Sequence, residues 1–327
     1  MSSIQEVAKK AGVGVGTVSR VINDSGYVSE KTRKIVEEVI EELNYKPNEL
    51  ARNLFRNRTN IVAVITPAIG NPYYATLYSE VEKRLRKYGY KTMLCNTIGE
   101  ATNEEAYLEM LERNMVDGII TGTHTLDYSS YKKIKGPIVG FDTPKLNDDI
   151  LIVTADHEKG GILAAKALIE SGCKEVLQFT DATTKNYPFI KRHKAFAKEI
   201  KKAGLICREY KPKMDNFEEK FIQENIDEAF SMYPNVDGVF ATDTHALLYM
   251  KKALSMGKRV PQDLKVVAYD GTFILNTAYP SPSAIVQPID KLAKVAVDSL
   301  HAIINGEKID RKTKVLDIEF RQGMTTN

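Results

Sequence analysis

The sequence predicts an α/β protein in which a small N-terminal helix-turn-helix headpiece precedes a larger body of two lobes, each built on a parallel sheet. Three observations lead to this prediction. Residues 1–46 hold three short amphipathic segments, with a glycine-containing turn between the first two. From residue 61 onward, short apolar runs alternate with amphipathic segments of helix length, which is typical of a parallel sheet covered on both faces. This alternation occurs twice, and 327 residues are enough for two or three domains.

The first two segments have the apolar spacing of helices. In residues 4–11 apolar side chains recur at i, i+3, i+4 and i+7, which predicts a helix capped by Ser3 and ended at the turn of Gly12. Apolar residues at 18, 21 and 22 repeat this period. The exposed side of the second helix then carries Val15, Gly16, Ser19 and Arg20. Two short helices joined by a tight turn have a shape that fits the major groove of DNA.

The third segment, residues 29–43, predicts a helix with Ser29 at its N-cap. Its inward positions are expected to be Ile35, Val36, Val39, Ile40 and Leu43. We expect the three helices to form one domain over residues 1–46. The glycines at 12, 14 and 16 also allow a phosphate-binding loop, but such a loop follows a strand, and the preceding segment has helical spacing. No cofactor is predicted.

Residues 47–60 form a short basic segment with helical spacing. Its second part, residues 50–60, carries three arginines and no acidic residue. One interpretation is a solvated linker. The other is a hinge helix formed on DNA, which would wedge Leu54 between base pairs in the minor groove while the arginines neutralise phosphates.

Five short segments, VAKKAGV, TVSRVIN, VSEKTR, LNYKPN and LAR, occur in this order within residues 1–60. In order and spacing they resemble the DNA-binding headpiece and hinge helix of the lactose/galactose repressor family of bacterial transcription regulators. The resemblance implies a homodimer that places two recognition helices in successive major grooves of a pseudo-palindromic double-stranded DNA operator. Paired hinge helices would open the minor groove between them.

The resemblance also assigns residues to the DNA: Val15, Gly16, Thr17, Ser19, Arg20, Ala51 and Leu54. Of these, Thr17 and Ser19 fall where phosphates are held, and Leu54 takes the intercalating position. Arg20 can grip a guanine edge with two hydrogen bonds, worth roughly 1–3 kcal/mol of discrimination, and a plain phosphate contact is the alternative. Gly16 has no side chain with which to read a base.

The body is predicted from seven apolar runs, residues 61–65, 92–95, 118–121, 138–141, 176–180, 238–242 and 266–269. Helical segments separate them at residues 73–89, 102–114, 158–172, 189–204, 218–233 and 244–257. The stretches Val116-Asp117-Gly118 and Val236-Asp237-Gly238 echo each other and indicate two similar lobes. By the family's topology, the first lobe comprises residues 61–154 and 284–313, and the second 155–283 and 314–327. Facing carboxyl ends of parallel strands would form a ligand cleft.

Acidic residues directly follow three of the predicted strands: Asp142, Asp243 and Asp270. Carboxylates beside an arginine and aromatic rings suit a sugar, because hydroxyl groups take paired hydrogen bonds and the apolar face of the ring packs on an aromatic side chain. The chain has no tryptophan, so stacking falls to Tyr73, Tyr74, Phe141, Tyr269 or Phe273. Asp243 could instead cap the helix that follows it, and Asp270 could brace a loop.

The body resembles the same family through NPYY at 71–74, RHKAF at 192–196, TD at 242–243, YDG at 269–271 and QP at 287–288. The resemblance places Asp142, Arg192, Thr242 and Asp270 at effector-contacting positions. Asn71 and Tyr73 would shape the mouth of the cleft and cap its first helix. Ala195 stands where relatives usually have glycine, and residues 207–222, which match poorly, offer Phe217 as a further aromatic contact. The loop at 269–272 and the stretch 108–118 resemble the sucrose-repressor branch, which implies a sucrose- or fructose-type sugar, free or phosphorylated, as effector.

Composition limits the other classes of function. Lys and Arg number 46 against 43 Asp and Glu, so the nucleic-acid signal is local. Three separated cysteines, the lack of a signal peptide and the lack of a membrane-length apolar run predict a cytoplasmic protein with no membrane partner. Five histidines lack metal-ligand spacing, and no catalytic pattern is visible, so an enzyme is not expected. A transport-type sugar-binding protein would share the body but have no use for the headpiece. A regulator with a phosphorylated protein corepressor in place of the sugar stays open.

Overall fold

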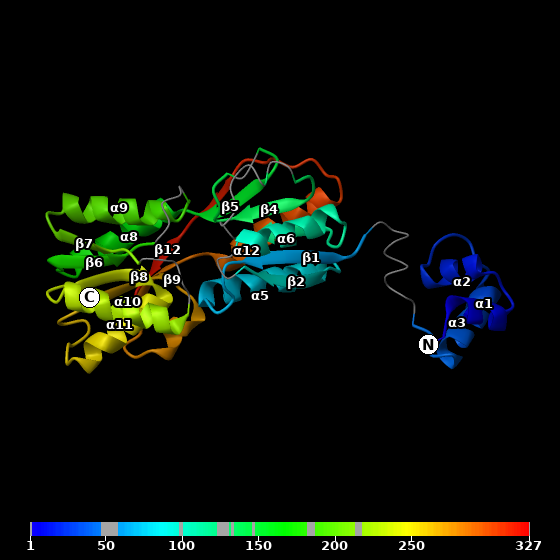
Figure 1. Ribbon diagram of the computed structural model, residues 1–327, viewed down its shortest axis with the longest axis horizontal. Helices are drawn as coiled ribbons and strands as arrows, with labels where there is room; N and C mark the ends of the chain where they lie inside the picture. Colours follow the sequence, from blue (N-terminus) through cyan, green and yellow to red (C-terminus); the bar gives the residue numbers. More distant parts are fainter. Residues whose placement is uncertain are drawn as a thin grey trace. The chain divides into compact units, whose positions relative to one another are not determined.

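A computed structural model describes residues 2–46, 58–97, 101–122, 131, 134–145, 148–181, 187–212 and 218–326. The chain divides into two compact units, Met1–Thr59 and Asn60–Asn327. The predicted α/β class is confirmed, with a helical unit followed by a body of two parallel-dominated sheets (Figure 1).

The first unit contains, within residues 2–46, helices α1 (Ile4–Ala11), α2 (Val15–Ile22) and α3 (Glu30–Glu42). Ser3 and Glu6 form a reciprocal cap at the start of α1: the Ser3 Oγ accepts from the Glu6 amide at 3.2 Å, and the Glu6 carboxylate accepts from the Ser3 amide at 2.8 Å. Gly12 ends α1 with φ of +68°, a left-handed conformation that glycine adopts without strain. Ser29 caps α3 as predicted.

The three helices pack on a small shared core. Its buried members are Val7, Ala8, Val18, Val21, Val36 and Val39. The prediction that Ile35 points inward is wrong, because its side chain is 39% exposed while the next residue along α3 takes the inward position. The alternative of a phosphate-binding loop is also wrong, since the segment before Gly12 is a helix.

The first sheet of the body has the strand order β11-β5-β4-β3-β1-β2 among the described residues. Helices α5 and α12 cover one of its faces and α6 covers the other. Alternation of side chains along β1 divides the two cores: Val62 and Val64 face α5, whereas Ala63 and Ile65 face α6. The elements are β1 (Ile61–Thr66), α5 (Pro72–Lys87), β2 (Lys91–Asn96), α6 (Ala101–Glu112), β3 (Gly118–Thr121), β4 (Ile138–Phe141), β5 (Leu151–Ala155), α12 (Ile289–Ile304) and β11 (Lys314–Leu316).

The second sheet has the matching order β12-β10-β9-β8-β6-β7 over the part of the chain that the structure describes. Helices α8 and α9 pack on one face, and α10 and α11 pack on the other. The elements are α8 (His157–Glu170), β6 (Glu175–Phe179), α9 (Ile190–Lys202), β7 (Ile206–Tyr210), α10 (Glu219–Met232), β8 (Gly238–Thr242), α11 (Asp243–Ser255), β9 (Lys265–Asp270), the 3₁₀ helix η1 (Phe273–Thr277), β10 (Ser283–Val286) and β12 (Glu319–Arg321).

The sequence echo at 116–118 and 236–238 has a structural reason. It precedes β3 and β8, which hold the same position in their sheets. The Asp117 carboxylate accepts from the amide of Asn60 at 2.9 Å, just before β1, and Asp237 accepts from the amides of Lys174 and Glu175 at the start of β6. Each aspartate thus ties the start of one strand to the start of its neighbour.

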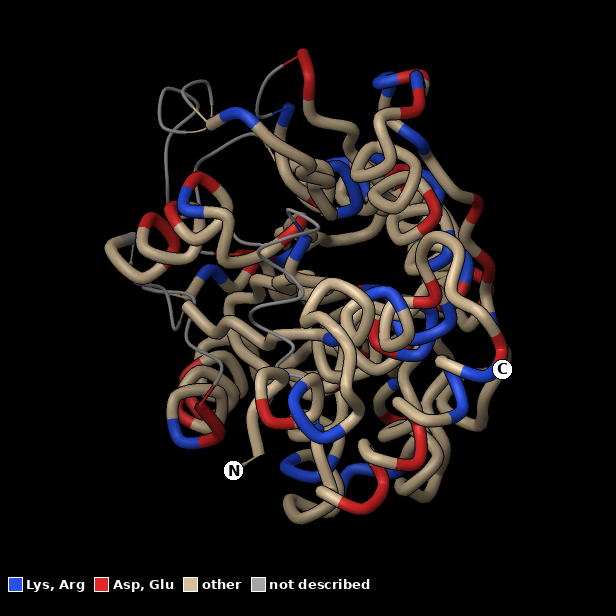
Figure 2. Tube along the Cα trace, turned by 90° about the vertical axis from the view of Figure 1, so that its right-hand side faces the viewer, with Lys and Arg blue, Asp and Glu red and all other residues tan. Residues whose placement is uncertain are grey.

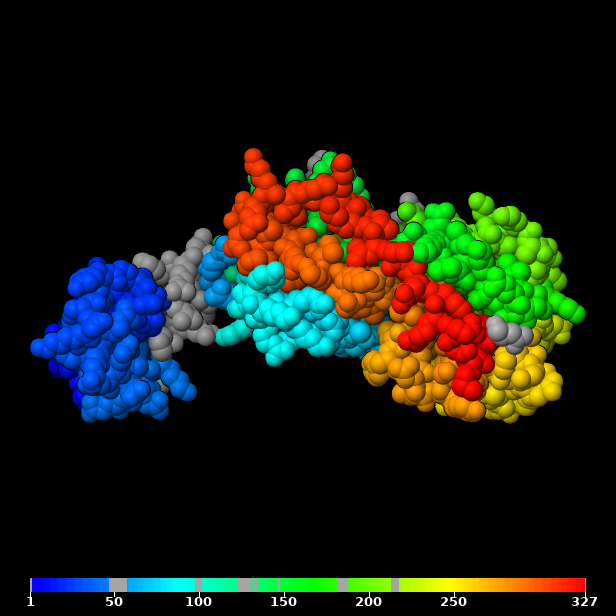
Figure 3. All heavy atoms as spheres, turned by 180° about the vertical axis from the view of Figure 1, so that it is seen from behind, coloured from blue at the N-terminus to red at the C-terminus, as the bar shows by residue number. Residues whose placement is uncertain are grey.

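Three chain segments connect the two lobes. They follow β5, β10 and β11, and the last of them leads to β12 at the C-terminus, seen in red in Figure 3. Two predicted lobe boundaries need correction. Residues 284–286 belong to the second sheet, because β10 pairs with β9, and residues 314–316 belong to the first sheet, because β11 pairs with β5.

Seven described elements of the body lay outside the predicted pattern: β5, β7, β10, β11, β12, α12 and the 3₁₀ helix η1. The strand β7 is a polar edge strand without an apolar run, whereas β5, β10 and α12 are rich in apolar residues. Lys and Arg are interspersed with Asp and Glu along the described chain (Figure 2), in keeping with the small net charge of +3. Among the described helices, none combines the length and apolarity needed to cross a bilayer.

Candidate functional site

A cleft of about 510 Å³ opens in the body at the carboxyl ends of β6, β7 and β8. Residues 70–72 at the start of α5 supply the first lobe's share of its wall, and the first turns of α10 and α11 supply much of the rest. Its size lies within the range of small-ligand sites. The carboxyl ends of parallel strands therefore meet at a cleft, as the sequence predicted.

Three of the predicted effector residues line this cleft: Asn71, Arg192 and Thr242. The Asn71 side chain caps α5 by accepting from the Tyr73 amide at 2.9 Å. Thr242 ends β8, and its hydroxyl lies 2.9 Å from Nδ1 of His245 on α11. Helix α9 presents Arg192 from the opposite face of the sheet.

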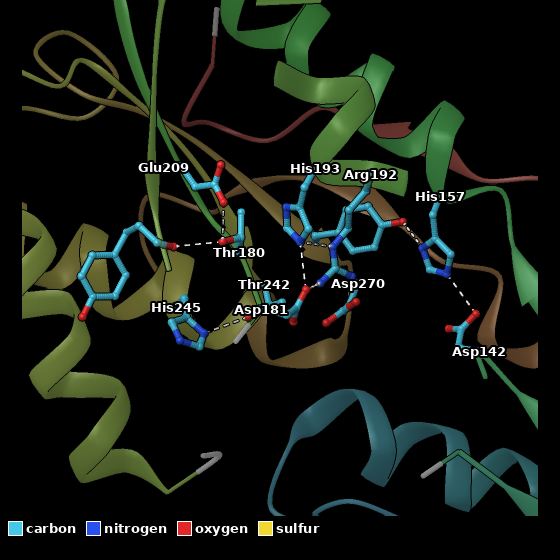
Figure 4. A network of polar contacts seen from close by, with 12 residues as sticks. Asp142, His157, Thr180, Asp181, Arg192, His193, Glu209, Thr242, His245 and Asp270 are labelled. Carbon is cyan, nitrogen blue, oxygen red and sulfur yellow. Dashed lines mark hydrogen bonds and ion pairs between the residues drawn. The ribbon is translucent and has the colours of Figure 1, made fainter. Parts of the chain in front are cut away.

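Arg192 is buried, and groups from β9 and from the residues just after β6 hold it (Figure 4). Its Nη2 lies 3.4 Å from Oδ2 of Asp181, and its guanidinium carbon lies 4.6 Å from the centre of the Tyr269 ring. Burial alone would lower the pKa of Arg192, but the Asp181 carboxylate raises it, so the guanidinium stays charged. Burial would conversely raise the pKa of Asp181, and Arg192 with His193 holds it at about 2.

Asp142 and Tyr73 lie behind the cleft, in a buried network that joins the lobes. The Asp142 carboxylate accepts from the Tyr73 hydroxyl at 3.1 Å and lies 2.9 Å from Nε2 of His157. The other ring nitrogen of His157 lies 2.6 Å from the Tyr269 hydroxyl. The same Tyr73 hydroxyl is 3.3 Å from Oε1 of Gln287. A continuous path therefore runs from Asp142 in the first lobe to the ring that packs on Arg192 in the second.

Asp243 and Asp270 brace the loop that follows β9. Asp243 does not cap α11 with its side chain; its carboxylate accepts from the Thr272 amide and hydroxyl, each at 2.6 Å, and from the Gly271 amide at 3.1 Å. Asp270 accepts from Nε2 of Gln287 at 2.9 Å. Burial raises the pKa of Asp243 to about 6, and burial beside Asp243 raises that of Asp270 well above its usual value.

Asp142 and Asp270 occupy matching places at the carboxyl ends of equivalent strands: Asp142 directly follows β4, and Asp270 is the last residue of β9. Both have positive φ angles, +49° and +110° respectively, which are rare for a residue with a side chain. Strain of this kind persists only where the surrounding contacts hold it. The two carboxylates are therefore fixed in orientation from both lobes.

Several cleft residues were not predicted: Phe179, Asp181, Tyr210 and His245. Asp181 comes just after β6, so the rule that selected Asp142, Asp243 and Asp270 would also have found it. Of the aromatic rings proposed for stacking, Phe273 is 63% exposed, and Phe141 and Tyr269 are buried. Phe217 lies outside the described residues. Within the described ranges, no group of three or more His, Cys, Asp and Glu side chains is arranged to hold a metal.

In the first unit, α2 presents an open surface. Val15 is 42% exposed, Gly16 and Arg20 are exposed, and a Cβ atom built on Gly16 would meet nothing within 4 Å. Thr17 and Ser19 are half-buried, and the Ser19 hydroxyl accepts from the Asn23 amide group at 3.3 Å. The predicted hinge positions Ala51 and Leu54 lie outside the described residues.

The two units define a class of protein, in which a helix-turn-helix DNA-binding domain is joined to a two-lobed body with a ligand cleft. Residues 3–48 match the family model for bacterial regulatory proteins of the lacI family, and residues 165–326 match that of the periplasmic binding protein-like domain. The sucrose operon repressor of Lactococcus lactis is 37% identical over 99% of this chain and 100% of its own length. The chain belongs to the lacI family.

Other relatives agree with this assignment. The ribose operon repressor of Halalkalibacterium halodurans is 34% identical over 95% of this chain and 92% of its own length. A LacI-type regulator from Alkaliphilus metalliredigens, solved with D-xylulofuranose, is 28% identical, with a TM-score of 0.75 over 82% of this chain and 99% of that one. The lac repressor dimer bound to operator is 21% identical and shares the fold, with a TM-score of 0.83 over 99% of this chain and 98% of that one.

Proposed function

We propose that this chain is the repressor of a sugar-utilisation operon, whose affinity for its operator is controlled by a small sugar bound in the cleft. The observation that carries the proposal is the pairing of an exposed helix-turn-helix surface with a cleft that holds Arg192 beside Asp181. Relatives of this family include sucrose and ribose operon repressors, which supports control by a sugar. We further propose that the chain acts by binding and has no catalytic activity, since its relatives are transcription regulators.

The cleft offers both kinds of contact that a sugar needs. The Asp181 carboxylate accepts hydrogen bonds from hydroxyl groups, and Arg192 and Thr242 donate to them. The ring of Phe179 offers an apolar surface for a sugar face. We propose Asn71, Arg192 and Thr242 as direct effector contacts. Tyr73, Asp142, Asp243 and Asp270 act one step away, by holding the loops and the lobe angle.

We propose that the sugar acts through the relative angle of the two lobes. The buried path from Arg192 through Tyr269 and His157 to Asp142 crosses between the lobes. A ligand that favours one arrangement of this path shifts the body toward one lobe angle. In a homodimer on a pseudo-palindromic operator, that change would separate the two predicted hinge segments and with them Leu54. Recognition itself is proposed to rest on Val15, Thr17, Ser19 and Arg20 of α2 and on Ala51 in the hinge.

The test is fluorescence anisotropy of the purified full chain on DNA from upstream of its own gene, at one fixed salt concentration. The panel includes sucrose, fructose, ribose and their phosphates. Specific binding that one sugar changes at least tenfold supports the proposal. Specific binding that no sugar changes would contradict sugar control and favour a phosphorylated protein corepressor. A chain that binds no fragment of the genome specifically in a pull-down and sequencing experiment would contradict the repressor assignment.

A further inference from the structure

The cleft extends well beyond the residues around Arg192. Its lining runs from Thr242 at the end of β8, past Asp181 after β6, to Tyr210 at the end of β7. These three strands are consecutive neighbours in the second sheet. Since neighbouring strands lie about 4.8 Å apart, this edge spans about 10 Å. A single sugar ring placed against Arg192 and Asp181 would therefore leave the Tyr210 end of this edge largely uncovered.

The end of the cleft away from Arg192 has its own walls, which we call the distal subsite: Phe179, Tyr210, Glu219, Ile222, Asn225 and His245. Figure 4 shows His245 on the other side of Asp181 from Arg192. The Phe179 ring lies 5.3 Å from that of Tyr210 and 5.5 Å from that of His245, between centroids. The first turns of α10 and α11 flank these rings.

The distal subsite combines an apolar wall with two polar groups from α10. The Tyr210 hydroxyl lies 2.7 Å from Oε2 of Glu228 and 3.1 Å from Oδ1 of Asn225, two acceptors that share its one proton, and the NH₂ group of Asn225 can donate to a ligand. Glu219 adds a carboxylate that can accept from hydroxyl groups. An aromatic surface beside an amide and a carboxylate is the set of contacts that a second sugar ring requires.

The charge of the cleft argues against a phosphate group. Among the described lining residues, Arg192 is the one cationic side chain, and Asp181 neutralises it at 3.4 Å. Asp181 and Glu219 leave the described lining with an excess of negative charge. A phosphoryl group in the distal subsite would face Glu219, and no cationic side chain of the described lining lies there to compensate its charge.

We propose that the cleft takes an unphosphorylated disaccharide, with one ring against Asp181 and Arg192 and the other in the distal subsite between α10 and α11. This inference rests on the proposed control by a sugar and narrows its ligand class. It distinguishes a ligand of two sugar rings from a single-ring pentose or hexose. The relatives, which are named for sucrose and ribose operons, are compatible with either kind of ligand.

The experiment is isothermal titration calorimetry of the full chain with sucrose, cellobiose, maltose and trehalose, with glucose, fructose and ribose, and with sucrose 6-phosphate. One disaccharide is expected to bind at least tenfold more tightly than any monosaccharide and than sucrose 6-phosphate. A monosaccharide or the phosphorylated sugar that binds as tightly as every disaccharide would overturn the inference. If such a monosaccharide also changes operator affinity, the proposed function stands and only the two-ring ligand is wrong. If no saccharide binds while operator binding persists, control by a sugar fails as well.

Variants of α10 test the distal subsite itself. Glu219→Gln and Asn225→Ala should each weaken the preferred disaccharide about tenfold, the loss of one hydrogen bond to a polar or charged group. Binding of its component monosaccharide should change less than twofold. Glu224→Gln is the matched control, because Glu224 is exposed on the same helix and does not line the cleft. Equal weakening of both sugars, or none of either, would show that the second ring does not lie there.

Discussion

Arg192 combines a full charge with nearly complete burial, and three neighbours make this possible. Asp181 balances its charge, the Tyr269 ring covers one face of the guanidinium, and the Phe189 ring lies 5.5 Å from it. The planar fork of arginine, rather than its charge alone, can meet two sugar hydroxyls at once. We therefore expect the geometry of this one side chain to set how the proposed sugar is oriented.

Replacing Arg192 by lysine should keep the charge beside Asp181 but remove the fork. We expect Arg192→Lys to reduce the sugar response at least tenfold while operator affinity without sugar stays within twofold. Arg192→Ala should abolish the response and also lower the melting temperature, because it leaves the buried Asp181 carboxylate without its guanidinium partner and with the His193 ring alone. Anisotropy on operator DNA and calorimetry check the two effects, with Lys194→Ala as an exposed control on α9. A normal sugar response in Arg192→Lys would exclude the paired hydrogen bonds.

His245 makes stability depend on pH. Burial lowers its pKa to about 4, below the value of about 6.5 for an exposed histidine. The unfolded chain therefore binds the proton more readily than the folded one between these values. Stability that this residue contributes is present above about pH 6.5 and is lost as the pH falls toward 4. We expect urea unfolding of His245→Gln to show a smaller loss of free energy from pH 6.5 to 4 than the original chain. An equal loss in both would mean that His245 titrates normally.

Helices α8 and α9 meet at Gly161, whereas the neighbouring Gly160 faces β9, and the Gly161 contact decides where Arg192 stands. A Cβ atom on Gly161 would lie 2.1 Å from the Arg192 carbonyl oxygen, and one on Gly160 would lie 2.9 Å from the Tyr269 hydroxyl. The sequence has alanine at position 195, where relatives usually have glycine, and this difference bears on the packing of α9. In this chain the close approach comes from α8 instead, and Ala195 is simply buried on α9.

Gly161→Ala should therefore force α9 away from α8 and move Arg192 with it. We expect the body to lose on the order of 1–3 kcal/mol of stability, as for overpacked cores, and sugar affinity to fall more than tenfold. Scanning calorimetry and sugar titration measure the two effects. Gly16→Ala is the matched control, because nothing lies within 4 Å of its Cβ position. There the exchange should stabilise the helix by about 1 kcal/mol. A stable Gly161→Ala chain with normal sugar binding would contradict the close contact.

The elements found from sequence were those with strong local signals. Six of the seven apolar runs matched strands that are largely buried on both faces, because such strands leave no polar side to confuse the pattern, and the seventh matched the more exposed edge strand β2. The edge strand β7, Ile206–Tyr210, contains two adjacent charged residues and gave no apolar run. The sheets that β10 and β11 join depend on strand pairing, with the neighbouring β9 for β10 and with the distant β5 for β11. Short strands at a crossover carry no local sign of which sheet they join.

At the scale of the whole molecule, the cleft could be located from sequence but its inner arrangement could not. Strand ends and the family resemblance led to Asn71, Arg192 and Thr242. Some of the predicted effector residues line the cleft, and others are buried behind its wall and support it. Which residue does which depends on how the side chains pack at the edge of the sheet. Asp142, 145 residues before Gln287, shares the Tyr73 hydroxyl with it only because two crossovers bring them together. Periodicity within one segment cannot contain that information.

The proposed coupling between sugar and operator predicts a defect confined to DNA binding when the intercalating side chain is shortened. Leu54→Ala should weaken specific operator binding at least fivefold, because an alanine cannot hold the base step open. Sugar affinity of the free protein and the melting temperature of the body should not change. Anisotropy on operator and on scrambled DNA measures the loss of specificity. Unchanged operator affinity would count against the minor-groove wedge and leave residues 47–60 as a plain linker.

Coupling of this kind must also be reciprocal. If the sugar changes operator affinity by some factor, the operator must change sugar affinity by the same factor. We therefore expect the sugar dissociation constant, measured by calorimetry with and without saturating operator, to change by the factor that anisotropy gives for the operator. Replacing His157 by phenylalanine keeps an aromatic ring at this position but removes its two polar contacts, 2.9 Å to the Asp142 carboxylate and 2.6 Å to the Tyr269 hydroxyl. The change in operator affinity caused by the sugar and the change in sugar affinity caused by the operator should then both fall toward onefold, while specific operator binding without sugar persists. A His157→Phe chain that keeps the full factor would show that the lobes communicate by another route.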